Sequence, residues 1–454
     1  MVTSSNGKDK RNTWGRAPTQ HMPQEKTRVD VVDIGCDLDG AVTRIMDAGG
    51  VGDIIRDRPD ECYIKVNAID FKPYVYTSLD VTASVIDYCK RAGARRVFLM
   101  DNSTQSNFTR LVFEIAGFRG LAAEHGAKPL YLDEGREAKI RLPHMGYDVR
   151  VSKRVKHIIE HRDCVTYINV PKLKTHSMTV MTAGIKNQYG FVAHRDRSLD
   201  HNFNLHRKLA DVYSVIQPDF TLVDGSIVTI YGHYPLETLH EKTLVPLNIL
   251  VGGRDTVAVD TVCARILGYD VDEIRHLAEA RDMGLGCANL DSIKVKGEPL
   301  SRFNQKYPYQ LYDAFPRDVA VIHGTDQNCP EGCNTNTLAV LQMLYLDFNG
   351  KGDFTIIMGK GFDRKQIDAI EGRVLIAGPC AYDETAERLI DRLGRSRVSF
   401  TRECNDLAST AGALAKLMKV SPRKMVPLNL LKSARLLAQA RLHGSKARIP
   451  RLIR

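Results

Sequence analysis

A regular alternation of short apolar runs and helical stretches between residues 317 and 420 constrains the fold more than any other feature of this sequence. The runs are rich in β-branched and other apolar residues and predict strands at 318–323, 354–358, 373–377 and 397–400. Helical periodicity follows at 335–346, 384–393 and 407–418. Because strands that alternate with helices build parallel sheets, we expect a smaller Rossmann-like parallel α/β domain at residues 315–420.

The same alternation, less regular, covers residues 29–305 and predicts a larger α/β core domain with a parallel or mixed sheet. Polar residues recur where its predicted strands end: Lys65 and Asn67, then 101–104, then 172–176. In open parallel sheets, ligands bind outside the carboxyl ends of the strands. The recurrence therefore predicts one shared crevice.

The two ends of the chain differ from the body in composition. Residues 1–28 are polar and aperiodic, which predicts disorder. Residues 421–454 hold nine Lys or Arg and no acid, so this tail carries nearly all of the net charge of +10. A basic tail can contact RNA, an anionic lipid surface or an acidic partner, or it can be a solvated extension with a short helix near 428–442.

No stretch approaches the ~20 apolar residues that cross a bilayer, and the first residues lack the apolar region of a secretory signal. We therefore expect a cytoplasmic protein without a membrane span. Its ten cysteines are too sparse for a disulfide framework.

Four late cysteines follow the predicted strands of the smaller domain, and a parallel sheet brings such connections to one edge. They are Cys329, Cys333, Cys380 and Cys404. Thiolates from several loops are typical of iron–sulfur and zinc sites, and the CxxxC spacing with two distant cysteines favours a [4Fe–4S] cluster over zinc. A redox thiol pair and plain structural cysteines stay as alternatives.

Residues 168–190 form the most unusual segment of the larger domain. Lys172, Lys174 and His176 alternate after Pro171, so an extended chain would point all three to one side, where they would bind a carboxylate or phosphate. Lys186 and Asn187 follow as further donors. Partial burial would lower the pKa of Lys186 and make it a nucleophile or base.

The sequence GGRDTVAVD places two carboxylates at the start of a predicted helix over 259–267. Asp255 suits an N-terminal cap, and Asp260 is then expected to face the crevice. His194, His201 and His206 share no helical face, and we expect them to be surface residues rather than metal ligands.

Three stretches, IKVN at Lys65, INVPKLKTH…TAGIKNQYG and GGRDTVAVDTVCARILG, together resemble the domain of unknown function 362 family over about residues 30–300. This family is often labelled iron–sulfur by association, but it supplies no reaction. The resemblance implies that its motif positions are Lys65, Asn67, Lys172, Lys174, His176, Lys186, Asn187, Asp255 and Asp260. His176 ten residues before Lys186 is also similar to a segment of nickel-pincer lactate racemases, in which a lysine carries the cofactor, although the residues around Lys186 depart from that pattern.

The leading hypothesis is an iron–sulfur redox enzyme acting on an anionic small molecule, with an electron-donor protein as its expected partner. His176, Lys186 and Asp260 are its predicted catalytic residues. The predicted substrate-binding residues are Lys65, Asn67, Lys172, Lys174 and Asn187. The alternatives are a non-catalytic cluster carrier or electron-transfer protein, and a pincer-type racemase or isomerase.

Overall fold

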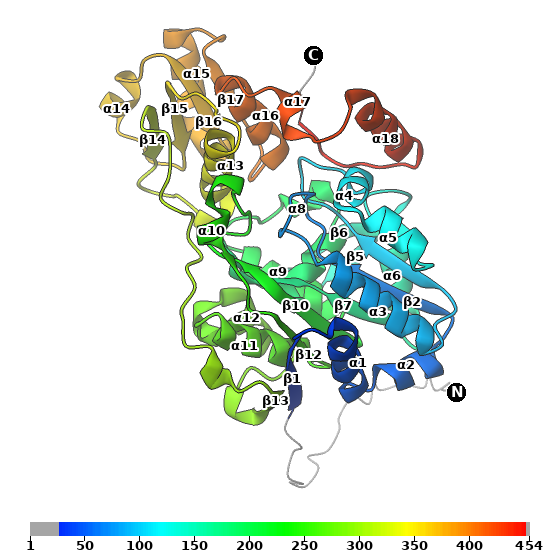
Figure 1. Ribbon diagram of the computed structural model, residues 1–454. Helices are drawn as coiled ribbons and strands as arrows, with labels where there is room; N and C mark the ends of the chain where they lie inside the picture. The colour runs from blue at the N-terminus through cyan, green and yellow to red at the C-terminus, as the bar shows by residue number, and fades with distance from the viewer. Residues whose placement is uncertain (1–26, 451–454) are drawn as a thin grey trace, which may run out of the picture.

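The computed structural model describes residues 27–450, which form two α/β units, a larger one below and a smaller one above in Figure 1. The larger unit contains the sheet strands β1 (Thr27–Asp33), β2 (Glu61–Val66), β3 (Val97–Asp101), β4 (Lys128–Tyr131), β7 (Val165–Val170), β8 (Lys172–His176), β9 (Val180–Thr182), β10 (Phe220–Thr229), β11 (Leu244–Val245), β12 (Ile249–Gly253) and β13 (Ile293–Gly297). A separate antiparallel hairpin joins β5 (Glu137–Leu142) to β6 (Tyr147–Ser152).

The main path of neighbouring strands in the large sheet has the order β13-β1-β12-β10-β7-β2-β3-β4. The stretch from β10 through β4 is parallel, whereas β12 is antiparallel to both of its neighbours. The predicted parallel or mixed α/β core is therefore confirmed, with a mixed sheet. Strands β2, β3 and β7 end together, so the polar residues at their carboxyl ends meet at one edge.

Both faces of the large sheet are buried, because successive side chains of a strand point to opposite faces. Leu222 and Leu250 pack in one core, while their neighbours Val223 and Val251 pack in the other. One core is covered by α1 (Leu38–Ala48), α2 (Val51–Asp57), α3 (Leu79–Arg91), α4 (Thr109–Ala116) and α5 (Phe118–Glu124). The helices α7 (Gly184–Asn187), α9 (Leu205–Val215), α11 (Thr256–Ile266) and α12 (Arg275–Asp282) pack in the other. The remaining helices of this unit are α6 (Lys153–Glu160), α8 (His194–Arg197) and α10 (His240–Thr243).

The smaller unit has a parallel sheet with the sequential order β14-β15-β16-β17. Its strands are β14 (Val319–His323), β15 (Phe354–Met358), β16 (Arg373–Ala377) and β17 (Val398–Phe400). Its helices are α13 (Thr335–Leu346), α14 (Arg364–Asp368), α15 (Pro379–Leu393) and α16 (Leu407–Leu417). The predicted parallel α/β unit is confirmed, and alternate residues such as Ile356 and Ile357 again fill two cores.

The second predicted helix of the smaller unit, expected at 384–393, begins earlier than expected. The structure starts α15 at Pro379, with Pro379 in the first helical position after Gly378. Proline is favoured there because its fixed φ suits a helix and its missing N–H would have no helical partner. Cys380 therefore lies in the first turn of a helix and not in a loop.

The basic tail folds back over the larger unit. It forms α17 (Pro422–Met425) and α18 (Leu430–Leu442), and Leu436 and Ala440 of α18 pack against Phe108 and Leu111. Lys432 pairs with Glu114 and Lys446 with Glu137, at 2.8 and 2.9 Å, and Arg448 pairs with Glu403. The tail is thus a strap on the protein's own surface. The short helix expected near 428–442 is confirmed as α18, whereas the interpretation as a solvated extension was wrong for residues up to 450.

Within residues 27–450, no helix is long and apolar enough to span a bilayer. The predicted disorder of residues 1–28 falls mostly outside the described residues, but Thr27 and Arg28 already belong to β1. The expected boundary near 305–315 falls in irregular chain between Arg302 and β14.

Candidate functional site

A cationic pocket lies at the carboxyl edge of β2 and β3, where the smaller unit covers the larger one. It has a volume of about 120 Å³. The larger unit contributes Lys65, Asn67, Asp101, Lys174, His176, Lys186, Asn187, Arg197, His201 and His233, and the smaller unit contributes Asn336, Asn405 and Leu407. Among the described residues that line the pocket, four are Lys or Arg and one, Asp101, carries a carboxylate. This excess of basic over acidic side chains suits an anion, whose charge would favour the protonated amines.

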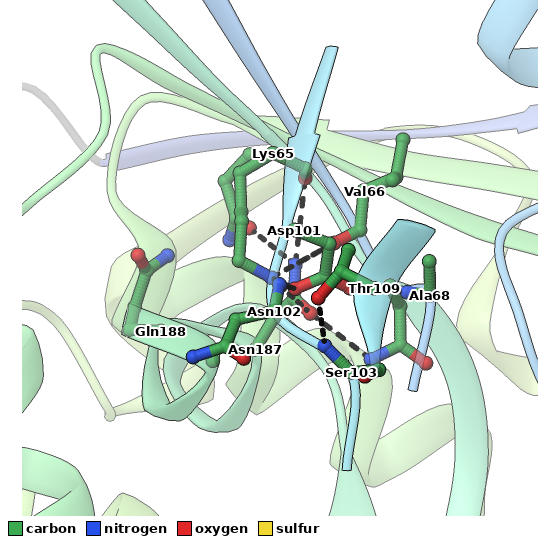
Figure 2. Close-up of polar contacts among 12 residues, drawn as sticks. Lys65, Val66, Ala68, Asp101, Asn102, Ser103, Thr109, Asn187 and Gln188 are labelled. Carbon is green, nitrogen blue, oxygen red and sulfur yellow. Dashed lines mark hydrogen bonds and ion pairs between the residues drawn. The ribbon is translucent and has the colours of Figure 1, made fainter. Parts of the chain in front are cut away.

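Lys65 and Asp101, which both line the pocket, form a buried ion pair (Figure 2). The Nζ atom of Lys65 lies 2.6 Å from Oδ1 of Asp101, and both side chains are 1% exposed. The other carboxylate oxygen accepts a hydrogen bond from the backbone N–H of Ala68. Burial lowers the pKa of Lys65, against the opposing effect of Asp101. The pair fixes the ends of β2 and β3 relative to each other.

Lys174 is held by neutral oxygens instead of a carboxylate. Its Nζ donates to Oδ1 of Asn67 at 2.8 Å and to the carbonyl of Val75 at 2.6 Å. Asn67 donates in turn to Oδ1 of Asn187, at 3.0 Å. Burial, followed by the nearby charges of Lys186 and Lys172, lowers the pKa of Lys174 well below its ordinary value. An anion in the pocket would restore the charge on this amine.

Lys186 is presented by the short helix α7, which enters through a tight approach of the backbone. A Cβ on Gly184 would lie 2.4 Å from Cγ2 of Thr256, so only glycine fits at the first position. The carboxylate of Asp260 accepts hydrogen bonds from the N–H groups of Gly184 and Ile185, at 2.7 and 2.9 Å. Helix α11 thereby positions the short helix α7, which carries Lys186.

Burial, with a further contribution from Arg197, lowers the pKa of Lys186 to about 7. Among the described residues, no carboxylate or hydrogen-bond acceptor contributes to that shift. The amine is therefore divided between its charged and neutral forms near neutral pH. It faces a pocket whose volume suits a small ligand. Such an amine can pair with an anion or act as a base or nucleophile.

His176 lies in the pocket with its ring stacked on that of His233, at 3.9 Å between centroids and 5° between planes. Burial, then His233 and the two lysines Lys186 and Lys174, lowers the pKa of His176 well below its ordinary value. Its Nδ1 accepts a hydrogen bond from the backbone N–H of Met178 at 3.2 Å. A neutral ring with Nδ1 as acceptor carries its proton on Nε2, so His176 offers a hydrogen-bond donor.

Two sequence-predicted site residues lie outside the pocket. Lys172 pairs with Asp224 at 2.9 Å and both side chains are buried, because β8 lies beside β10 at this point and turns Lys172 toward it. Asp260 does not face the crevice, since its carboxylate is fully buried and held by α7. The expected direct roles of Lys172 and Asp260 are therefore corrected to structural and positioning roles. Asp255 does cap its helix, accepting from the N–H of Ala258.

Several pocket residues were not predicted as site residues. Asp101 belongs to a polar cluster at a strand end, a signal that was available in the sequence. Arg197 was missed because nothing in its spacing marks it; its guanidinium is buried and donates to the carbonyls of Asn102 and Ser103, at 3.0 and 2.6 Å. His194, His201 and His206 are buried, so the expectation that they lie on the surface was wrong.

A second pocket, of about 200 Å³, is lined by all four late cysteines. Cys329 and Cys333 flank a short segment before α13, Cys380 lies at the start of α15, and Cys404 lies between β17 and α16. Burial and the nearby cysteines raise the pKa of Cys333 to about 11 and of Cys404 to about 12. The sheet thus brings the four thiols to one cavity.

The backbone around these thiols is shaped for close approach. Gly378 has a φ of +95°, and a Cβ there would lie 2.6 Å from the Sγ of Cys333. Gly359, with a φ of +97°, lines the same cavity. Soft thiolates with small neighbours are the donor set of iron–sulfur clusters and also of zinc sites. In the part of the chain that the structure describes, no group of three or more His, Cys, Asp or Glu side chains is already arranged to hold a metal ion.

The two pockets share a wall. His201 lines the cationic pocket, whereas its neighbour Asn202 lines the cysteine pocket. Likewise, Cys404 lines the cysteine pocket and its neighbour Asn405 lines the cationic one. Nδ1 of His201 also lies 2.6 Å from the carbonyl of Glu331, between Cys329 and Cys333. The loops that carry the thiols therefore contact the segment that encloses the cationic pocket.

Residues 63–265 match the family described as a domain of unknown function, DUF362. The match supports the resemblance that the motifs predicted, and it extends from β2 to α11. It includes every predicted residue of the cationic pocket and ends before the first of the four late cysteines.

A thylakoid-associated protein of Synechocystis sp. is 30% identical over 133 residues, which are 28% of this chain and 40% of that protein. The matched stretch thus covers less than half of the relative.

Proposed function

We propose that this protein is a cytoplasmic iron–sulfur enzyme that carries out a redox reaction on a small carboxylate or phosphate bound in the cationic pocket. The observation that carries the proposal is the shared wall between a cavity of four thiols and a cavity in which basic side chains outnumber carboxylates. A [4Fe–4S] cluster on Cys329, Cys333, Cys380 and Cys404 would supply electrons within a short distance of the bound substrate. An electron-donor protein would be its partner.

The chain's own residues have distinct roles in this proposal. The Lys186 amine pairs with the anionic group of the substrate, because it faces the pocket without a carboxylate of its own. His176 donates a hydrogen bond from Nε2 to a substrate oxygen. Arg197, which donates to backbone carbonyls, keeps the local potential positive, and the Lys65–Asp101 ion pair keeps the pocket rigid.

Purification of the full chain without oxygen, followed by iron, sulfide, zinc and nickel analysis, tests the cluster. We expect about four iron and four sulfide per chain and broad absorption near ~400 nm. Cys380→Ser is expected to lose most of the iron, while Cys36→Ser, which changes an exposed cysteine of the larger unit, keeps it. One zinc per chain without sulfide would overturn the cluster, and equal iron in both variants would overturn its site.

Two further measurements separate the enzyme from its alternatives. Lys186→Ala is expected to abolish turnover of the substrate while leaving the iron content unchanged; a carrier would retain its electron or cluster transfer in this variant. Lys186 and His176 share one pocket, as a pincer-type racemase would require. Added mass on Lys186 together with nickel in the purified protein would favour that racemase over the redox enzyme.

A further inference from the structure

A third cavity, of about 140 Å³, adjoins the cationic pocket. The two cavities have Ile69, Thr104, His233, Asn336 and Leu407 in common. A molecule whose charged end lies near Lys186 would therefore extend past these shared residues into the third cavity. We call this cavity the apolar chamber.

Apolar side chains form most of the chamber wall, and they come from three parts of the chain. Phe71 belongs to the larger unit, while Val340, Met343 and Ala411 belong to helices α13 and α16 of the smaller one. Met425, Val426 and Pro450 come from the strap. The chamber is thus closed only when both units and the strap are in place, which is typical of ligand pockets at domain interfaces.

The charged groups in the chamber wall already have partners. Lys72 forms an ion pair with Asp347. The carboxylate of Asp70 accepts hydrogen bonds from Nδ2 of Asn107 at 2.5 Å and from the N–H of Lys72 at 3.1 Å. What the chamber offers to a ligand is therefore apolar surface.

We infer that the substrate is amphipathic, with its carboxylate or phosphate in the cationic pocket and an apolar group in the chamber. This inference rests on the proposed function and specifies its substrate class. The volume sets the size of the apolar group, because an apolar cavity of ~150 Å³ holds one benzene molecule. A single aromatic ring or a short branched alkyl chain fits, and a long acyl chain does not.

Calorimetry with two matched pairs of probes tests the inference on the full chain: propionate against 3-phenylpropionate, and inorganic phosphate against phenyl phosphate. In whichever pair binds to the protein, we expect the aromatic probe to bind at least about tenfold more tightly than the short probe, because its ring leaves water for an apolar wall. Ala411→Phe fills the chamber from α16 and is expected to remove this gain without changing the affinity of the short probe. Ser409→Phe, on the exposed face of the same helix, is the matched control and keeps the gain.

The outcomes separate the inference from the proposed function. Equal affinities within a pair that binds would overturn the amphipathic substrate and leave the anion site intact. No binding of any of the four probes would overturn the anion site, and the inference with it. If Ala411→Phe fails to fold, Met343→Ala enlarges the chamber instead, and 3-(2-naphthyl)propionate should then gain affinity relative to 3-phenylpropionate; no such gain would also count against the chamber as the binding site.

Discussion

The thiol of Cys404 lies 3.7 Å from the carbonyl oxygen of His201, so the two pockets meet at this contact. Cys404 comes from the smaller unit, and His201 comes from the segment that closes the cationic pocket of the larger unit. The contact explains why neither unit alone contains the complete site. For this reason, the first prediction concerns a substitution that would displace one of the four thiols.

Gly378→Ala is expected to lower the iron content of the protein at least twofold. The added Cβ would lie 2.6 Å from the Sγ of Cys333, and the φ of +95° is unfavourable for alanine by about 1–3 kcal/mol. Iron and sulfide analysis and urea unfolding measure the two effects. Gly372→Ala is the matched control, because its φ of +80° brings a similar strain with no atom within 4 Å of the new Cβ. Equal iron loss in both variants would show that strain alone, and not the thiol contact, is responsible.

The affinity for propionate is expected to fall as the pH rises above about 7. The pKa of Lys186 is lowered to about 7 by burial, and a bound carboxylate raises it by pairing with the charged amine. Between the two pKa values, binding takes up a proton and the affinity falls by up to about tenfold per pH unit. Calorimetry between pH 6 and 9, in buffers of different ionisation enthalpy, measures both the affinity and the proton uptake.

Lys186→Met is expected to bind propionate weakly and without this pH dependence, whereas Lys128→Met, at an exposed position of β4, should behave as the wild type. An affinity that stays constant from pH 6 to 9 in the wild type would show that the Lys186 amine does not pair with the anion.

The sequence predicted the fold well where local and global signals agree. Helix α13 begins and ends at the predicted residues, Thr335 and Leu346, because a long, mostly apolar run lies there between polar neighbours. Helix α15 was predicted to begin at Glu384, because Gly378-Pro379-Cys380 was interpreted as a loop, whereas the structure places the start at Pro379. A proline after a glycine is a start signal as well as a turn signal, and only the backbone distinguishes the two.

The site was predictable only in part, for a related reason. Alternation in an extended chain correctly placed Lys174 and His176 in one pocket, but Lys172 faces Asp224 of β10, a partner 52 residues away that no local pattern reveals. Arg197 and His233 enter the pocket through the packing of distant segments. Their contribution depends on tertiary contacts, which periodicity does not encode.

Replacing Asp260 is expected to change how stability depends on pH. Burial raises the pKa of this carboxyl to about 7, above its value of about 3.9 in an unfolded chain. Its stabilising contribution is therefore complete below pH 4 and is lost as the pH rises through 7, by roughly a few kcal/mol. Asp260→Asn removes this dependence. The free energy of unfolding of the wild type should therefore fall relative to that of the variant as the pH rises from 4 to 8.

Urea unfolding at several pH values measures this difference, and Asp163→Asn, an exposed position, serves as the control. Asp260→Asn also tests whether Asp260 positions α7, because a displaced α7 would shift the pH midpoint of propionate binding. A difference that does not change with pH would show that Asp260 has the same proton affinity in the folded and unfolded chains.

The strap is expected to detach when a charge is placed at its contact with α4. Ala440 is fully buried beside Phe108 and Leu111, so Ala440→Asp would bury an unpaired carboxylate at a cost of at least ~2 kcal/mol, and the helix would leave the surface instead. Limited proteolysis should then cut between residues 420 and 450 at least about tenfold faster, as expected when a segment's local opening becomes easier by more than 1.4 kcal/mol. Leu431→Asp, on the same helix but 80% exposed, is expected to resist proteolysis like the wild type.

Because Met425 and Pro450 close the apolar chamber, Ala440→Asp should also lower the affinity for 3-phenylpropionate more than the affinity for propionate. An equal loss of affinity for the two probes would mean that the strap supports the cationic pocket and not the chamber.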